Sequence, residues 1–197
     1  MRIHRGSNKP KLSNNVRLVY RGWVRGSMTK NRKWLVKSID EILLPSLRRA
    51  GFFVVPLSKE DARSPEIRAA FPFGRLRRQR NAGFDQIEVQ LDKRSESAFR
   101  LNLGFFPVSQ VAENDGSREP DDDWVHYLGE SAELCERGFF SRWFSVKRLP
   151  WTDVSEDAYQ RLVARVAGYI PEIENYFRSD SLSCQHMPHI RRIKEAR

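Results

Sequence analysis

Two neighbouring segments in which apolar and polar side chains alternate constrain the fold of this chain most. They are residues 84–91 and 98–105, with apolar positions at Ile87, Val89, Leu91, Phe99, Leu101, Leu103 and Phe105. Because successive side chains of a strand point to opposite faces, each segment predicts a strand with one apolar and one polar face. The polar residues 92–97 favour a turn, so the pair predicts an antiparallel hairpin. Its polar face is expected to present four side chains to water or to a partner: Glu88, Gln90, Arg100 and Asn102.

Apolar side chains at spacings of three and four predict one helix before the strands and one after them. The first follows Thr29, and its apolar face comprises Leu35, Ile39, Ile42, Leu43 and Leu47. The second follows Ser155, and its apolar face comprises Tyr159, Leu162, Val163, Val166, Ile170 and Ile173. Pro45 is expected to kink the first helix or split off its last turn, and Gly51 to end it. Pro171 is expected to bend the second helix or start a new one.

Other patterns complete the expected fold. Strands are expected at residues 52–57 and 73–80 and near residues 139–146, with one more before the last of these, and a short helix at residues 65–70. We therefore predict an α+β domain over residues 29–178. In it, an antiparallel sheet of about four to six strands has the N-terminal and C-terminal helices packed on one face. Residues 179–197 are expected to form a C-terminal tail with a helical patch at residues 190–196.

The positive charge of the chain is concentrated at its N-terminus. The formal net charge is +10, but residues 1–37 contain eleven Lys and Arg and no Asp or Glu. The remaining 160 residues hold 24 basic and 25 acidic side chains, so the body of the protein is nearly neutral. We expect residues 1–28 to form a basic arm that is flexible or does not belong to the native chain. Alternatively, its cations bind nucleic acid or an anionic surface.

Composition excludes several classes of protein. Of the 197 residues, 40% are hydrophobic, which is enough to build a core. No apolar run approaches the roughly 20 residues that a membrane-spanning helix needs, so the sequence predicts no membrane span. The two cysteines exclude a disulfide-dense scaffold and a four-cysteine zinc site. The usual nucleotide-binding, serine-hydrolase and zinc-protease motifs are absent, and we expect no cofactor.

Several short motifs occur in an order that resembles an uncharacterised bacterial family, known only as a domain of unknown function. They are Ile42 to Pro45, Gly51-Phe52, Leu101-Asn102-Leu103-Gly104, Arg142-Trp143, Ile170-Pro171 and Tyr176-Phe177. The resemblance covers about residues 30–178. It implies a helix, Gly-Phe, antiparallel strands ending in Asn-Leu-Gly, and a C-terminal helix. It also implies a small accessory or immunity-type protein, and it supplies no catalytic residues.

Three groups of residues are candidate sites of chemistry. Cys184, His186 and His189 have ligand types and spacing that could hold zinc, but an ordinary polar tail is the favoured interpretation. Cys135 with His126 could form a nucleophile and base, but Cys135 is favoured as a small buried residue. Asp85 and Glu88 could hold magnesium in a nuclease hairpin, but alternation puts them on opposite faces, and pairing of Glu88 with Arg100 is favoured. The sequence therefore predicts no catalytic residues and no metal site.

Two further patches are candidates for binding. Asp121, Asp122, Asp123 and Trp124 lie in a polar surface loop and, together with the polar face of the hairpin, could contact a protein partner. The run Arg75, Arg77, Arg78 and Arg80 could grip phosphates together with Lys30, Arg32 and Lys33, or it could be a solvated edge strand.

The favoured hypothesis is a non-enzymatic protein-binding accessory or immunity-type module of a bacterial cytoplasm. It follows from a sound core pattern without a convincing catalytic constellation. The first alternative is a nucleic-acid-associated protein that uses the basic arm and the Arg75–Arg80 run. The second is a hydrolase whose site the sequence does not reveal.

Overall fold

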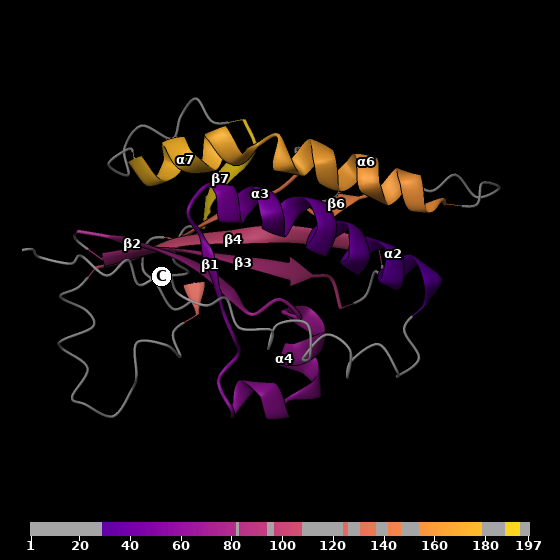
Figure 1. Cartoon of the computed structure of the whole chain (residues 1–197), viewed down its shortest axis with the longest axis horizontal. Helices are drawn as coiled ribbons and strands as arrows, with labels where there is room; N and C mark the ends of the chain where they lie inside the picture. Colours follow the sequence, from indigo (N-terminus) through magenta and orange to yellow (C-terminus); the bar gives the residue numbers. More distant parts are fainter. Residues whose placement is uncertain are drawn as a thin grey trace, which may run out of the picture.

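A seven-stranded antiparallel sheet with helices against it forms the fold (Figure 1). The computed structural model describes residues 29–81, 83–93, 97–107, 124–125, 131–136, 142–146, 154–178 and 188–193. The strands are β1 (Phe53–Val55), β2 (Arg75–Arg80), β3 (Gly83–Leu91), β4 (Ala98–Pro107), β5 (Ser131–Leu134), β6 (Phe144–Ser145) and β7 (Ile190–Ile193). Their order is β1-β2-β3-β4-β5-β7, and β6 also pairs with β4. The predicted α+β class with an antiparallel sheet is confirmed.

The hairpin of β3 and β4 lies at the centre of the sheet and has the predicted alternation. Ile87 pairs with Leu103 and Val89 with Leu101, and all four side chains are fully buried. They face the helices, whereas Glu88 pairs with Asn102 on the other face. Because the side-chain period of a strand is two, this register fixes which residues meet on each face.

The N-terminal helix continues through Pro45 because a wider, π-helical stretch precedes it. The α-helix α2 (Lys30–Ser38) leads into a π-helical stretch (Ile39–Leu43) and then into α3 (Leu44–Arg49), in which Pro45 occupies the first turn. Proline has no backbone N–H and its ring collides with the preceding turn of a regular helix. A π-helical turn before Pro45 accommodates both effects without interrupting the helix.

Gly51 ends this helix as predicted. Its φ of 90° is in the left-handed region that favours glycine. The Phe52 N–H donates to Leu47 O and the Gly51 N–H to Arg48 O, which is the Schellman arrangement. The chain thereby turns from α3 directly into the edge strand β1.

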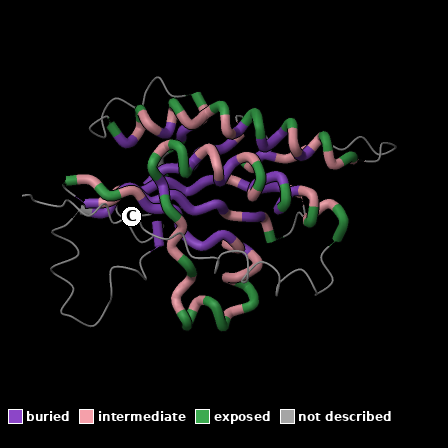
Figure 2. The backbone as a smooth tube through the Cα atoms, viewed as in Figure 1, coloured by how far each residue is buried: buried purple, intermediate pink, exposed green. Residues whose placement is uncertain are grey.

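The C-terminal helices complete the layer on one side of the sheet. They are α6 (Glu156–Ala167) and α7 (Ile170–Arg178), so Pro171 starts a new helix in its first turn. The helix α2 packs against α6, and the inner sides of both are buried together with the central strands (Figure 2). The short helix α4 (Pro65–Ala70) lies on the opposite side of the sheet (Figure 1) and is capped by Ser64, as Pro65 in a first helical turn predicts.

Two local predictions are wrong. The helical patch predicted at residues 190–196 is the strand β7, which pairs with β5 from Ile190 to Ile193. The Arg75–Arg80 run is not an edge strand, because β2 lies between β1 and β3. Both differences arise from pairing with distant segments, which single-segment patterns do not contain.

Candidate functional site

The sheet face away from α2, α6 and α7 carries a layer of polar side chains. This polar layer consists of Arg75, Arg77, Gln86, Glu88, Gln90, Arg100, Asn102 and Glu133. Cross-strand register brings them together, because Arg75 lies opposite Glu88, Glu88 opposite Asn102, and Asn102 opposite Glu133. Most of these side chains are buried, and Gln90 and Arg100 are half-buried. Burying so many polar groups costs stability unless they are paired.

Glu88 lies at the centre of the polar layer and is fully buried. Its Oε1 accepts hydrogen bonds from the Val125 N–H at 2.7 Å and from Gln86 Nε2 at 2.9 Å. Its Oε2 accepts one from Asn102 Nδ2 at 3.4 Å. Desolvation raises the pKa of Glu88 above its ordinary value, although these hydrogen bonds and the charge of Arg75 act in the opposite direction.

Each arginine of the polar layer has a carboxylate or amide acceptor and an aromatic ring beside it. Arg75 donates to Asp61 Oδ2 at 2.9 Å and lies 4.5 Å from the ring centre of Trp124. Arg77 donates to Gln86 Oε1 at 2.7 Å and stacks on Phe84, and Arg100 pairs with Glu133 and stacks on Trp143. The polar layer contains three arginines and two carboxylates, those of Glu88 and Glu133, and Asp61 from the turn before α4 supplies a third carboxylate. Together these side chains balance in charge.

The predicted exposure of this sheet face is wrong for its central residues. Glu88 and Asn102 are buried, and Trp124 is buried against Phe71, with ring centres 4.5 Å apart. The Val125 backbone and α4 pack on the polar side chains from that side. The expected pair of Glu88 with Arg100 is also wrong. Register places Arg100 opposite Gln90, and Arg100 Nε donates a hydrogen bond to Gln90 Oε1 at 2.9 Å.

The remaining β2 arginines lie on the helical side of the sheet. Arg78 donates twice to Asp85 Oδ2, at 3.0 and 2.8 Å, and also pairs with Glu174 of α7. Arg80 lies 3.4 Å from Asp85 Oδ1. Burial lowers the pKa of Arg78, but its bonds to Asp85 and Glu174 outweigh burial and raise the pKa overall. Desolvation raises the pKa of Asp85, and the two arginines oppose that effect. This cluster fastens α7 to the sheet.

The groups weighed as candidate sites of chemistry do not assemble within the described part of the chain. Asp85 and Glu88 lie on opposite sheet faces, as alternation predicted. No group of three or more His, Cys, Asp or Glu side chains suited to a metal occurs among the described residues. Cys135 is buried as predicted, and burial raises the pKa of its thiol. His189 lies 2.9 Å from Glu172 and stacks on Tyr169.

Several predicted residues are placed differently or lie outside the described residues. Arg32 donates to the backbone oxygens of Asp92 and Ala69, and Lys30 lies over the Trp34 ring. Lys33 is exposed. The basic arm, Asp121 to Asp123, His126, Cys184 and His186 are outside the described residues, so their proposed roles stay predictions.

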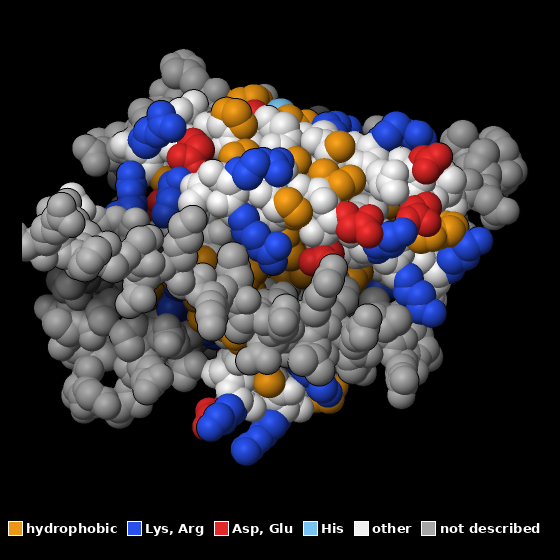
Figure 3. All heavy atoms as spheres, in the orientation of Figure 1, with side chains coloured by type: hydrophobic (Ala, Val, Ile, Leu, Met, Phe, Trp, Pro, Cys, Tyr) orange, Lys and Arg blue, Asp and Glu red, His pale blue; other side chains and the backbone are white. Residues whose placement is uncertain are grey.

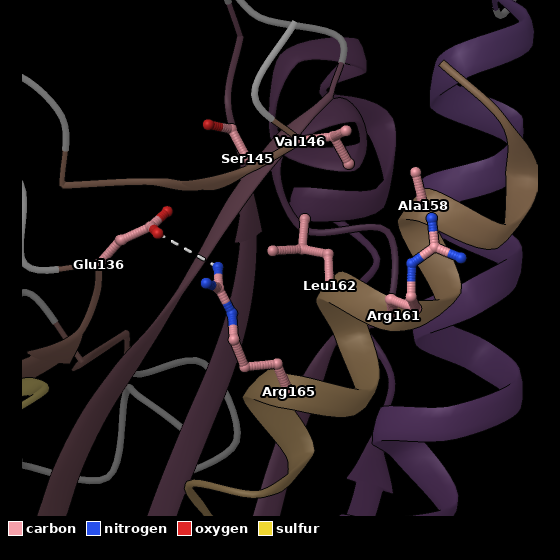
Figure 4. A pocket seen from close by; sticks show the side chains of 7 residues that line it. All are labelled: Glu136, Ser145, Val146, Ala158, Arg161, Leu162 and Arg165. Atoms are coloured by element: carbon pink, nitrogen blue, oxygen red, sulfur yellow. Dashed lines mark hydrogen bonds and ion pairs between the residues drawn. The ribbon is translucent and has the colours of Figure 1, made fainter.

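A groove that the sequence did not predict lies between α6 and β6 (Figure 4). Its volume is about 330 Å³. One wall is Ser145 and Val146, and the opposite wall is one face of α6 at spacings of three and four: Ala158, Arg161, Leu162 and Arg165. Glu136 closes one end and lies 3.2 Å from Arg165. The arginine pair bordering the apolar stripe of α6 was the only sequence signal for it.

Comparisons of this chain with models of protein families, with curated proteins and with solved structures find no match. Within the described ranges, the structure contains no helix that is long and apolar enough to cross a membrane.

Replacing Glu88 by Gln is expected to change how stability depends on pH. Burial raises the pKa of Glu88 in the folded state. Between the ordinary carboxyl pKa and this raised value, the folded protein therefore binds more protons than the unfolded chain. The free energy of unfolding of the wild type, relative to Glu88→Gln, should therefore fall as pH rises from the usual carboxyl range to the raised pKa, and should be constant above it. Urea unfolding at a series of pH values measures this difference. Asp85 is present in both proteins, so its contribution cancels in the difference between their free energies of unfolding. A difference that does not change with pH would contradict the burial of Glu88.

Proposed function

We propose that this chain is a non-enzymatic protein-binding module of the accessory or immunity type that its family resemblance implies. The observation that supports the proposal is the groove beside α6. It combines an apolar floor with charged groups at its rim, and it lies on the surface of the described structure (Figure 4). Surfaces of this composition are typical of protein recognition, in which apolar anchors supply affinity and charges supply specificity.

The polar layer does not offer a competing site for a charged ligand. Its arginines and carboxylates are engaged with one another, so it is better suited to stabilising one sheet register than to capturing a charged ligand. The alternative of nucleic-acid binding gains little from β2, because Arg75 and Arg77 are buried. Along the helices in Figure 3, Lys and Arg side chains are interspersed with Asp and Glu rather than forming a continuous basic surface.

Photocrosslinking in a lysate of the source organism tests the proposal. A benzophenone side chain at Ala158, in the wall of the groove, should give an adduct with one identifiable protein. The same group at the exposed Ala62, which lies before α4, serves as the control and should not. The identified protein, once purified, should bind the full chain in a titration. An Ala158 adduct no stronger than that of Ala62 would overturn the proposal, and so would substrate turnover by the purified chain.

A further inference from the structure

The strand β6 has an edge with no strand partner among the described residues. It pairs with β4 through Ala98↔Ser145 and Phe99↔Phe144. Further along, the same edge of β4 pairs with β5, from Leu101 to Gly104. Outside β5 lies β7, whereas the corresponding place outside β6 holds no described strand. As far as the described residues go, the edge of β6 away from β4 is therefore open to a further strand, and unpaired strand edges accept extended peptides.

The groove lies where this further strand would run. Ser145 and Val146, at the end of β6, form one of its walls, and α6 forms the other (Figure 4). Leu162, of which 6% is exposed, and Ala158 contribute apolar area to the α6 wall. An extended chain here would place alternate side chains against this apolar area and direct the others away from it.

The charges at the rim of the groove select an acidic chain. Arg165 is about half-exposed and shares its charge with Glu136 at 3.2 Å. Arg161 is exposed and has no ion-pair or hydrogen-bond partner in the described structure. Among the described residues that line the groove, two guanidinium groups thus face one carboxylate, which leaves an excess of positive charge. A guanidinium binds a carboxylate through two parallel hydrogen bonds, so a carboxylate of the partner fits Arg161.

We propose that the groove between β6 and α6 binds an extended acidic segment of a partner protein, which adds as a strand to the free edge of β6. A carboxylate of the segment pairs with Arg161, and an apolar side chain two residues away packs on Leu162 and Val146. The two side chains share a face because the period of a strand is two. This inference rests on the proposed protein-binding function and specifies the chemistry of the partner.

Fluorescence anisotropy of a labelled peptide of about eight residues tests the inference. Val and Glu occupy alternate positions on one face of the peptide, and Ser and Thr occupy the other face. The full chain should bind it. Arg161→Gln should weaken binding about tenfold, the effect of losing one charged hydrogen-bonded pair. Arg161→Lys should restore part of the loss, and Arg178→Gln, at an exposed arginine of α7, should have no effect.

Two altered peptides separate the parts of the inference. A peptide with Gln in place of Glu should bind as weakly to the wild type as the acidic peptide binds to Arg161→Gln. A peptide methylated at alternate backbone nitrogens, those that would face β6, should lose binding because it cannot donate to a strand edge. Equal binding of the methylated peptide, or unchanged binding by Arg161→Gln, would overturn the inference. So would tighter binding of single-stranded RNA than of the acidic peptide.

The outcomes also separate this inference from the proposed function. An identified protein crosslinked at Ala158, together with no binding of the acidic peptide, overturns the acidic strand and leaves the protein-binding function in place. Absence of a specific crosslink overturns the function itself.

Discussion

Glu88→Ala is expected to lower the free energy of unfolding by about 3–5 kcal/mol. The substitution removes the acceptor for the Val125 N–H, Gln86 Nε2 and Asn102 Nδ2, and all three donors lie where water is excluded. It also removes one of the two carboxylates that offset the charge of the fully buried Arg75, the other being Asp61. A buried donor left without an acceptor costs more than the intact hydrogen bond contributes. Urea denaturation followed by tryptophan fluorescence measures the change.

Two comparisons make this expectation specific to the polar layer. Glu88→Gln keeps the side-chain shape and one acceptor oxygen, and the Asn102 Oδ1 atom, which has no hydrogen-bond partner in the described structure, can accept from the new amide after rotation. Its cost should be at most about 1 kcal/mol. Glu60→Ala, at an exposed position, should change stability by less than about 0.5 kcal/mol. A loss for Glu88→Ala no larger than that for Glu60→Ala would mean that Glu88 is solvated.

The central hairpin and the long helices could be predicted from the sequence because their signals are local. Alternation at Ile87, Val89, Leu101 and Leu103 continues over whole strands and has no competing helical period. By contrast, β5 consists of Ser, Ala, Glu and Leu, which have little preference for strands. In β7, Ile190 and Ile193 are three apart, a spacing that also fits a helix. These two short strands form because each supplies hydrogen-bond partners to the backbone groups at the other's edge.

The candidate site could be predicted only in part, because its properties come from contacts between distant segments. The sequence placed Glu88 and Asn102 on the polar face of one hairpin, although it predicted Arg100 rather than Asn102 opposite Glu88. It could not reveal their burial, since the Val125 N–H that binds Glu88 is 37 residues away. The groove posed the same difficulty. The α6 arginines are visible in the sequence, but the wall of Ser145 and Val146 opposite them is a result of tertiary packing.

The two faces of the sheet use buried charge for different purposes. On the outer face, the polar layer pairs neighbouring strands and specifies their register, since a one-residue slip would place Glu88 among the apolar side chains under the helices. On the helical face, Arg78 joins a strand to a helix, because its guanidinium contacts Asp85 of β3, Glu174 of α7 and the Ala50 carbonyl at the end of α3. The contacts of Arg78 on the helical face predict a second large effect on stability.

Arg78→Ala is expected to cost about 3–5 kcal/mol, because it leaves the fully buried Asp85 with only the more distant Arg80 and removes packing on Phe52. Urea denaturation measures the loss, and hydrogen exchange should become faster in α7, which the arginine holds to the sheet. If the unpaired carboxylate causes the loss, Asp85→Asn should recover part of it in the Arg78→Ala background but cost stability in the wild type. Arg178→Ala, which removes an exposed arginine that also pairs with Glu174, should cost less than about 1 kcal/mol. Equal losses for Arg78→Ala and Arg178→Ala would show that Asp85 is not buried.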